Sequence, residues 1–309
     1  MQRTPDAVVD APLAVTPAAE PLDEVVAPQK KKTLGLGGWL ALVWVVGIGV
    51  AAILAPLLPI PEPTQIFPEI ARKGPTAGHL LGGDATGRDV LSRIIYGARA
   101  SYLVGFGAVA FGMVVGGTIG LMAGFFRGAF DAIATPAMNV FLAIPQFVLA
   151  LSLVTVLASQ DGVTGTRRLL VVIIGLGIVS VPLLGRITRA NTLTWAEREF
   201  VLAARAMGAK SWRIMFREVL PNVLPAMLSI ALLAVGIAIV AEGGLSLFGA
   251  GVQLPTPSWG NMIAAERSQM RTAPHTLIFT SIVLFLTVLA LNYLGDVVRQ
   301  RFDVRESML

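Results

Sequence analysis

The chain has 309 residues, of which 55% are hydrophobic and only 14% charged, and its mean hydropathy is +0.74. Soluble domains carry charge on about a quarter of their residues, so this composition excludes an ordinary soluble protein and places the chain in a bilayer. The net charge of +5 does not indicate nucleic-acid binding, because the basic residues flank apolar runs and form no basic soluble domain.

Six long uncharged runs follow one another along the chain. A spanning helix needs about 20 mostly apolar residues, and five of the runs are long enough. The fourth run becomes long enough if the arginines at its ends extend to the membrane surface. We therefore predict an all-α membrane protein with six transmembrane helices, from the runs 33–61, 100–126, 132–160, 169–185, 219–241 and 272–295.

The chain divides around these helices, with a tail at each end. Residues 1–33 lack apolar periodicity and are predicted to be a disordered tail. The later parts are a first transmembrane helix at 34–60, a loop at 61–99, a core of five helices at 100–298 containing a polar loop at 191–218, and a tail at 299–309.

Basic residues predict the orientation. With six spans both termini share a side, and Lys30, Lys31 and Lys32 before the first span predict that this side is the cytoplasm. We expect a multi-pass protein of the inner or plasma membrane, with the loops at 61–99 and 249–274 folded against the outer mouth of the bundle.

Glycine recurs at every fourth position of the second predicted helix. Stripes of small residues let transmembrane backbones approach closely, because packing replaces the hydrophobic drive that is missing in lipid. The stripe predicts packing either inside the subunit or against a second transmembrane subunit. Its members are Gly112, Gly116, Gly120 and Gly124.

Few residues in the chain could support catalysis or metal binding. There are two histidines far apart in sequence, no HExxH motif, no G-x-S-x-G motif and no cysteine. The sequence GAKS at 208–211 lacks the first glycine and the preceding strand of a phosphate-binding loop. We predict a non-catalytic chain without its own ATP, cofactor or metal site. Glu242 follows the uncharged run 219–241 and is either a structural group or a pathway or gating residue, which an ion-coupled carrier would use.

The stretch EFVLAARAMGAKSWRIMFREVLPNVLP at 199–225 is polar and basic. Thr194 followed by Glu197 fits a capping box and predicts a helix over 195–207. Gly208 then ends that helix in a left-handed conformation, and Ser211 caps a second one. Pro221 and Pro225 are predicted to fix or kink the start of the fifth span. From the residues alone, this helix rests on lipid headgroups or docks a soluble protein.

This stretch resembles the cytoplasmic loop of permeases of binding-protein-dependent ABC importers, whose signature is E-A-A, three residues, G and a downstream L-P. GGDATGRDVLSRIIYGARASYLVG at 82–105, AEGGLSLFGAGVQLPTPSWGNM at 241–262 and LTVLALNYLGDVVRQRFDVR at 286–305 are similar to the C-type permease of the dipeptide/oligopeptide/nickel branch. The resemblance covers roughly residues 79–305.

The resemblance implies a type I importer domain whose short cytoplasmic helix couples to an ATPase subunit. The family's glutamate position is Leu202 here, and Glu199 lies three residues earlier on nearly the same helical face. The implied coupling residues are Glu199, Leu202, Ala203, Ala204, Arg205, Gly208, Ala209, Leu220 and Pro221.

The resemblance also implies the partners. They are a similar B-type permease, two ATPase subunits that bind ATP and Mg, an extracytoplasmic solute-binding protein and membrane lipid. The expected function is ATP-driven import of dipeptides or oligopeptides. Nickel, haem or another small solute of the same branch is the alternative, and an ion-coupled carrier is a different class of function.

Overall fold

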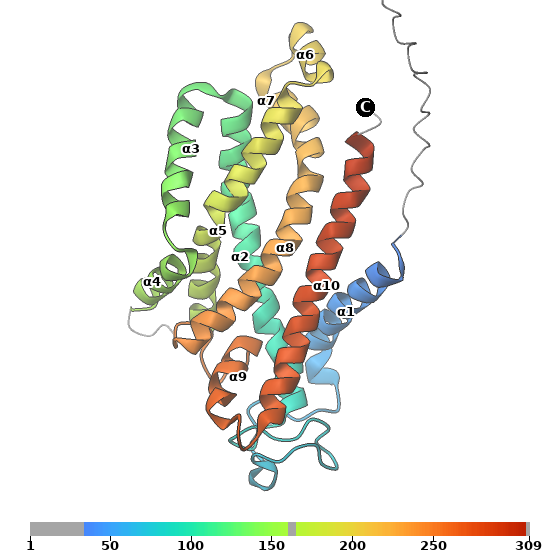
Figure 1. The fold of residues 1–309 in the computed structure, drawn as a ribbon, viewed down its shortest axis with the longest axis vertical. Coiled ribbons are helices and arrows are strands. Elements are labelled where there is room, and N and C mark those ends of the chain that lie inside the picture. The colour runs from blue at the N-terminus through green and yellow to red at the C-terminus, as the bar shows by residue number, and fades with distance from the viewer. Residues whose placement is uncertain (1–33, 160–164, 307–309) are drawn as a thin grey trace, which may run out of the picture. The chain divides into compact units, whose positions relative to one another are not determined.

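The computed structural model describes residues 34–159 and 165–306, and the tail predicted at 1–33 lies outside them. Five helices are long and apolar enough to cross a membrane, and a bent pair can form a sixth span (Figure 1). The structure therefore confirms a helical membrane domain with up to six spans. The five long helices are α1 (Leu36–Leu54), α2 (Val90–Phe126), α5 (Gly165–Ala196), α8 (Leu220–Leu247) and α10 (Pro274–Glu306).

The predicted third span, 132–160, is not one continuous helix. It consists of α3 (Gly128–Ala143) and α4 (Gln146–Ala158), whose axes differ by 92°. Pro145 causes the break, since proline disfavours a helical conformation in the residue before it and Ile144 is extended, at φ −80° and ψ 133°. An uncharged run thus identified the membrane segment but not its bend.

Two boundaries predicted from charge were wrong. The loop at 61–99 ends sooner, because α2 begins at Val90, where the Asp89 carboxylate accepts a hydrogen bond of 2.7 Å from the Ser92 backbone N–H. Arg93 does not stop the helix, since its guanidinium is buried beside Asp84 at 3.5 Å. At the other terminus α10 continues to Glu306, so most of the tail predicted at 299–309 is helical.

Helix α2 lies at the centre of the bundle. It packs against α5 and α8, while α10 packs against α8 and α1. A Cβ atom on Gly116 would lie 2.3 Å from the Val181 carbonyl oxygen, and one on Gly120 would lie 2.1 Å from the Gly185 carbonyl oxygen. Gly112 and Gly124 contact the same helix. The glycine stripe therefore packs inside the subunit, against α5.

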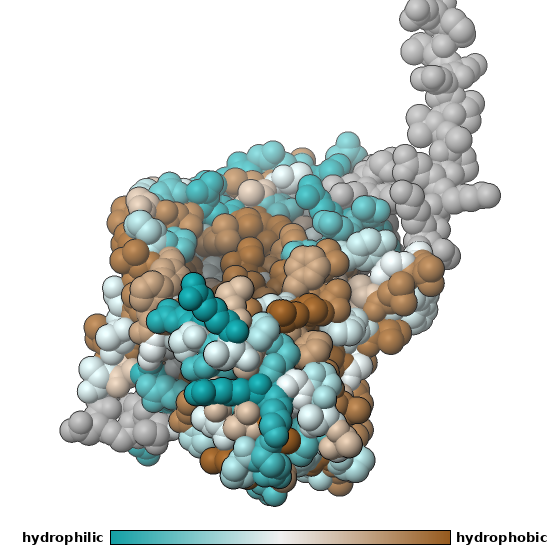
Figure 2. All heavy atoms as spheres, turned by 60° about the horizontal axis from the view of Figure 1, so that its bottom comes forward, coloured by the Kyte–Doolittle hydropathy of each residue, from teal (hydrophilic) through white to brown (hydrophobic). Residues whose placement is uncertain are grey.

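The two ends of the bundle are named here by the short helices that they carry, α6 (Glu199–Ala206) and α9 (Trp259–Glu266) (Figure 1). At the α9 end, Trp259 is fully buried, and its backbone and indole N–H groups each donate a hydrogen bond of 3.0 Å, to Ser101 Oγ and the Ile94 carbonyl. Part of the loop predicted at 249–274 thus folds against the bundle. Figure 2 shows hydrophilic residues across this end and hydrophobic residues on the flanks around it.

Candidate functional site

The polar segment at the α6 end joins α5 to α8. Helix α5 continues to Ala196, α6 follows over Glu199–Ala206, and α7 (Ser211–Ile214) leads through a π-helical turn at Met215–Val219 into α8. The structure separates the predicted 195–207 helix into the end of α5 and a shorter α6.

The capping residues predicted for this segment were wrong. Thr194 lies inside α5, where its hydroxyl donates to the Ala190 carbonyl at 3.3 Å instead of capping a helix start. Helix α6 is preceded by Arg198 and has no side-chain cap, and Ser211 is the first residue of α7 rather than its cap. Pairs of threonine and glutamate do not distinguish a helix start from a helix interior.

Gly208 forms the turn between α6 and α7. Its φ is +77°, the left-handed conformation that the sequence predicts. The Met207 N–H donates to the Ala203 carbonyl at 3.0 Å, and the Ala209 N–H donates to the Ala204 carbonyl at 3.1 Å. These bonds satisfy carbonyls at the end of α6 that would otherwise lack a partner.

One face of α6 anchors the segment to the bundle. Val201 is fully buried and Ala204 is 9% exposed. Both belong to an apolar cluster with Trp195, Ile214, Met215 and further residues of α2 and α8. Burial of this face holds α6 on the bundle end through apolar contacts.

Much of the remaining surface of α6 is exposed. Glu199 and Ala203 are exposed, and Leu202 is 52% exposed at the edge of a hollow beneath the helix. The two alanines of the signature therefore have different surroundings: Ala204 packs inward and Ala203 faces outward. Leu202 and Glu199 lie on the exposed side, so both can meet a partner.

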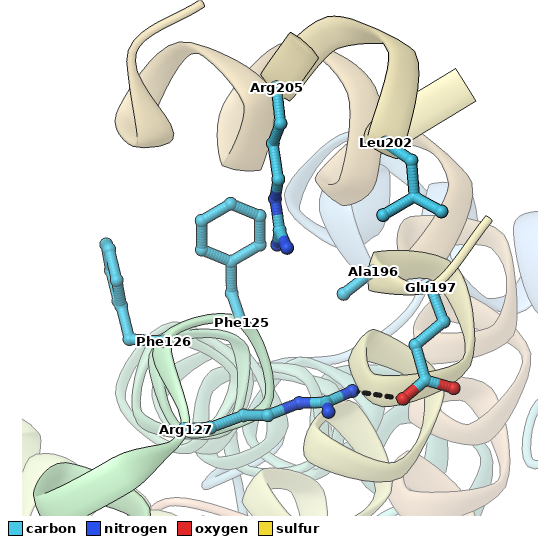
Figure 3. Close-up of a pocket in the computed structure, with 7 residues that line it drawn as sticks. All are labelled: Phe125, Phe126, Arg127, Ala196, Glu197, Leu202 and Arg205. Atoms are coloured by element: carbon cyan, nitrogen blue, oxygen red, sulfur yellow. Dashed lines mark hydrogen bonds and ion pairs between the residues drawn. The ribbon is translucent and has the colours of Figure 1, made fainter. Parts of the chain in front are cut away.

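A hollow of about 340 Å³ lies beneath α6 (Figure 3). Arg205 reaches into it, with its guanidinium carbon 5.4 Å from the centroid of the Phe125 ring. Across the hollow, Arg127 donates to Glu197 at 2.5 Å. The lining residues are Phe125, Phe126, Arg127, Ala196, Glu197, Leu202 and Arg205.

Leu220 and Pro221 form the first turn of α8. Pro221 has no N–H to donate to the carbonyl four residues before it, and the wider π-helical turn Met215–Val219 precedes it. Ser211–Leu247 nevertheless qualifies as one span. Pro221 and Pro225 are thus accommodated within a continuous helical path into the membrane.

Glu242 lies far from α6, towards the α9 end of α8, and is fully buried. Its Oε1 accepts hydrogen bonds from Ser246 Oγ at 2.7 Å, Ser258 Oγ at 3.0 Å and the Val252 N–H at 3.3 Å. These bonds tie α8 to the 252–258 segment. In this conformation the carboxylate is closed off from the surface.

A buried charge cluster at the α9 end was not predicted from the sequence. Asp84 accepts from Arg88 Nε at 2.7 Å, and Glu266 Oε1 accepts from the Ala85 N–H at 3.2 Å. Burial raises the pKa of Asp84, but hydrogen bonds from Arg88 and Thr86 and the charges of Arg88 and Arg93 outweigh it and lower the pKa overall. Burial raises the pKa of Glu266. The alternation of acidic residues and arginines in DATGRDVLSR, at 84–93, is the sequence feature that could have predicted this cluster.

Several transporter permeases are similar in sequence to this chain along most of its length. It is 35% identical over 286 residues to the dipeptide transport system permease protein of Alkalihalophilus pseudofirmus, covering 93% of this chain and 90% of that one. The di/tripeptide permease of Pseudomonas aeruginosa is 35% identical over 87% of each chain. The glutathione permease of Pectobacterium atrosepticum is 38% identical over 75% of this chain and 74% of its own.

Similarity to a solved structure supports the fold. The inward-facing MetNI methionine ABC transporter matches 68% of this chain and 96% of its own, with a TM-score of 0.55 and 20% identity. Residues 116–307, which include α6 and the turn at Gly208, match the family described as binding-protein-dependent transport system inner membrane component. The chain is therefore a multi-pass membrane protein that belongs to this family of transporter permeases.

Proposed function

We propose that the chain is a transmembrane permease subunit of an ATP-driven importer and conducts short peptides. The observation that carries the proposal is the identity of 35% over 93% of the chain to a dipeptide permease. Two further relatives are described as di/tripeptide and glutathione permeases, whose solutes are also small peptides. Nickel chelates, haem and other small solutes are the alternatives within the branch.

The proposed assembly places the α6 end in the cytoplasm. The lysines at 30–32 and the arginines of 198–217 support this orientation, since basic residues concentrate on the cytoplasmic side. A similar B-type permease would enclose the pathway with this chain, and two ATPase subunits would bind ATP and Mg. A solute-binding protein would meet the α9 end. This subunit would itself catalyse no reaction.

In the proposed mechanism α6 is the element that docks to an ATPase subunit. Its inner face, Val201 and Ala204, is held by the bundle, while Glu199, Leu202 and Ala203 remain free for a partner. ATP binding and hydrolysis can bias the bundle between outward-open and inward-open states only if the ATPase binds α6 differently in the two states. The apolar Leu202 predicts an apolar contact where the family signature has a glutamate.

The experiment compares two glycines at opposite ends of the bundle that have similar positive φ angles. Gly208 has φ +77° and Gly249 has φ +72°, and a Cβ atom on either would meet no atom within 4 Å. The transporter is reconstituted in vesicles with its binding protein, and uptake of a labelled dipeptide is measured with and without ATP. Gly208→Val is expected to reduce ATP-dependent uptake and stimulated ATP hydrolysis, because valine disfavours a positive φ.

Gly249→Val is the matched control and is expected to retain ATPase coupling, since it introduces similar strain away from α6. Both variants are first shown to insert and assemble. Equal uptake by wild type and Gly208→Val would contradict the coupling role. Uptake that needs an ion gradient and no ATP would contradict the importer itself.

A further inference from the structure

A polar groove runs between α3 and α5, on a different part of the surface from the hollow beneath α6. Asp131, Thr135 and Asn139 recur at every fourth residue of α3 and so share one face of it. Arg186, Arg189 and Ala190 share a face of α5 in the same way. The space between them measures about 550 Å³. The α3–α5 groove is lined by Thr135, Asn139, Arg186, Ile187, Arg189 and Ala190.

One of the two arginines is already neutralised. Arg189 donates through Nε and Nη2 to the two carboxylate oxygens of Asp131, at 2.5 and 2.6 Å. Thr135 Oγ also donates to Asp131, at 2.7 Å. The charges of Arg189 and Asp131 cancel in this bidentate pair, and the hydroxyl hydrogen of Thr135 is already donated to Asp131.

Arg186 remains without an acidic partner. Within residues 34–159 and 165–306 its guanidinium makes no salt bridge, although it is exposed and lines the groove. It directly follows the uncharged run 169–185 of a membrane-spanning helix, where an arginine at the end of the run can extend to the membrane surface and meet an anionic group. The Asn139 amide on the facing helix also has no hydrogen bond within that part of the chain and can donate.

We infer that the α3–α5 groove binds one oxyanion, a carboxylate or a phosphate, between Arg186 and the Asn139 amide. A planar guanidinium suits the two oxygens of either group. The oxyanion has two possible sources: the terminal carboxylate of the transported peptide, which rests on the proposed function, or the phosphate of a membrane lipid. The peptide carboxylate and the lipid phosphate would accept from the same donors. The donors therefore do not identify the source, and the experiment must distinguish the two.

The chain contains no cysteine, so a single introduced thiol reports on the groove in this subunit. Ala190→Cys places the thiol in the groove, one helical turn from Arg186, and removes none of the proposed donors. The assembled transporter is placed in nanodiscs, which leave both membrane faces accessible. The rates of modification of this subunit by an anionic and by a cationic methanethiosulfonate are then measured by mass spectrometry.

Removing the charge of Arg186 should change these rates in opposite directions. We expect Arg186→Gln to slow the anionic reagent about fivefold and to speed the cationic one by a similar factor, the effect of one nearby unit charge in water. Arg186→Lys should retain the wild-type preference. Arg213→Gln removes another exposed arginine, outside the groove, and should leave both rates unchanged.

Ligand protection identifies the source of the oxyanion. Dialanine at millimolar concentration should slow modification if the site takes the peptide carboxylate, whereas dialanine amide should not. Phosphatidylglycerol in the nanodisc should slow it, compared with phosphatidylcholine alone, if the site takes a lipid phosphate. The inference is overturned if the thiol reacts with neither reagent, if Arg186→Gln leaves both rates unchanged, or if neither dialanine nor phosphatidylglycerol protects. Since labelling needs no transport, failure of peptide uptake would count against the proposed function alone.

Discussion

Replacement of Gly120 by alanine tests the closest contact inside the bundle. A Cβ atom at this position would lie 2.1 Å from the Gly185 carbonyl oxygen and 3.0 Å from the Arg189 nitrogen, whereas ordinary van der Waals contact begins at 3.4 Å. Both obstructing atoms belong to the backbone of α5. No side chain can rotate away, so α2 and α5 must move apart.

The expected loss of stability follows from this separation of α2 and α5. Overpacking a well-packed contact typically costs about 1–3 kcal/mol, and here the neighbouring contacts of Gly116 and Gly124 would be lost together. Alanine recovers about 1 kcal/mol through its higher helix propensity. Because the obstruction is backbone, we take the upper end of that cost, about 3 kcal/mol, and therefore expect Gly120→Ala to lower the free energy of unfolding by about 2 kcal/mol.

Gly97 supplies a control in the same helix. A Cβ atom there would lie 3.5 Å from Ser258, which is ordinary contact, so Gly97→Ala should be neutral or stabilising by up to about 1 kcal/mol. The free energy of unfolding is measured by titrating each purified variant from mild detergent into sodium dodecyl sulfate. Equal stability of Gly120→Ala and wild type would refute the close approach of α2 and α5.

Substitutions at two further residues test the α9 end. Burial raises the pKa of Glu266, so its contribution to stability is complete below the ordinary pKa of 4.5 and is lost as the pH rises through the folded pKa. The melting temperature of Glu266→Gln relative to wild type should therefore rise between pH 4.5 and neutral pH, and a constant difference would contradict this. Glu242→Ala leaves three hydrogen-bond donors without their acceptor and should cost about 3 kcal/mol, whereas Glu242→Gln keeps one oxygen and should cost less. Equal losses in the two Glu242 variants would show that the hydrogen bonds are not the cause.

The features predicted correctly from sequence are those set by local chemistry. Long apolar runs identified the membrane segments because a bilayer requires them whatever the tertiary fold. Gly208 was predictable because a positive φ at a helix end favours glycine. The stripe at Gly112 to Gly124 predicted a close helix contact, but its partner α5 required the structure.

The errors arose where distant residues decide the outcome. Charge was used to end helices, yet Arg93 lies inside α2 because Asp84, in a separate loop, pairs with it. Thr194 fitted a capping box, but α5 had not yet ended at that position. Neither the salt bridge nor the length of α5 follows from the spacing of nearby residues. The polar groove was missed because its two faces lie on helices about 50 residues apart in the sequence.

The two ends of the bundle are held by different forces, and this bears on which of them can move. At the α9 end, Trp259 and Glu242 make buried hydrogen bonds and the buried Asp84 carboxylate pairs with Arg88, and these contacts require fixed geometry. At the α6 end, Val201 and Ala204 make apolar contacts, which are not directional, and the ion pair of Arg127 with Glu197 is exposed. A shift at the α6 end displaces mainly apolar contacts, whereas the same shift at the α9 end breaks several buried hydrogen bonds. A partner that pushes on α6 therefore acts on the more easily displaced end of this subunit.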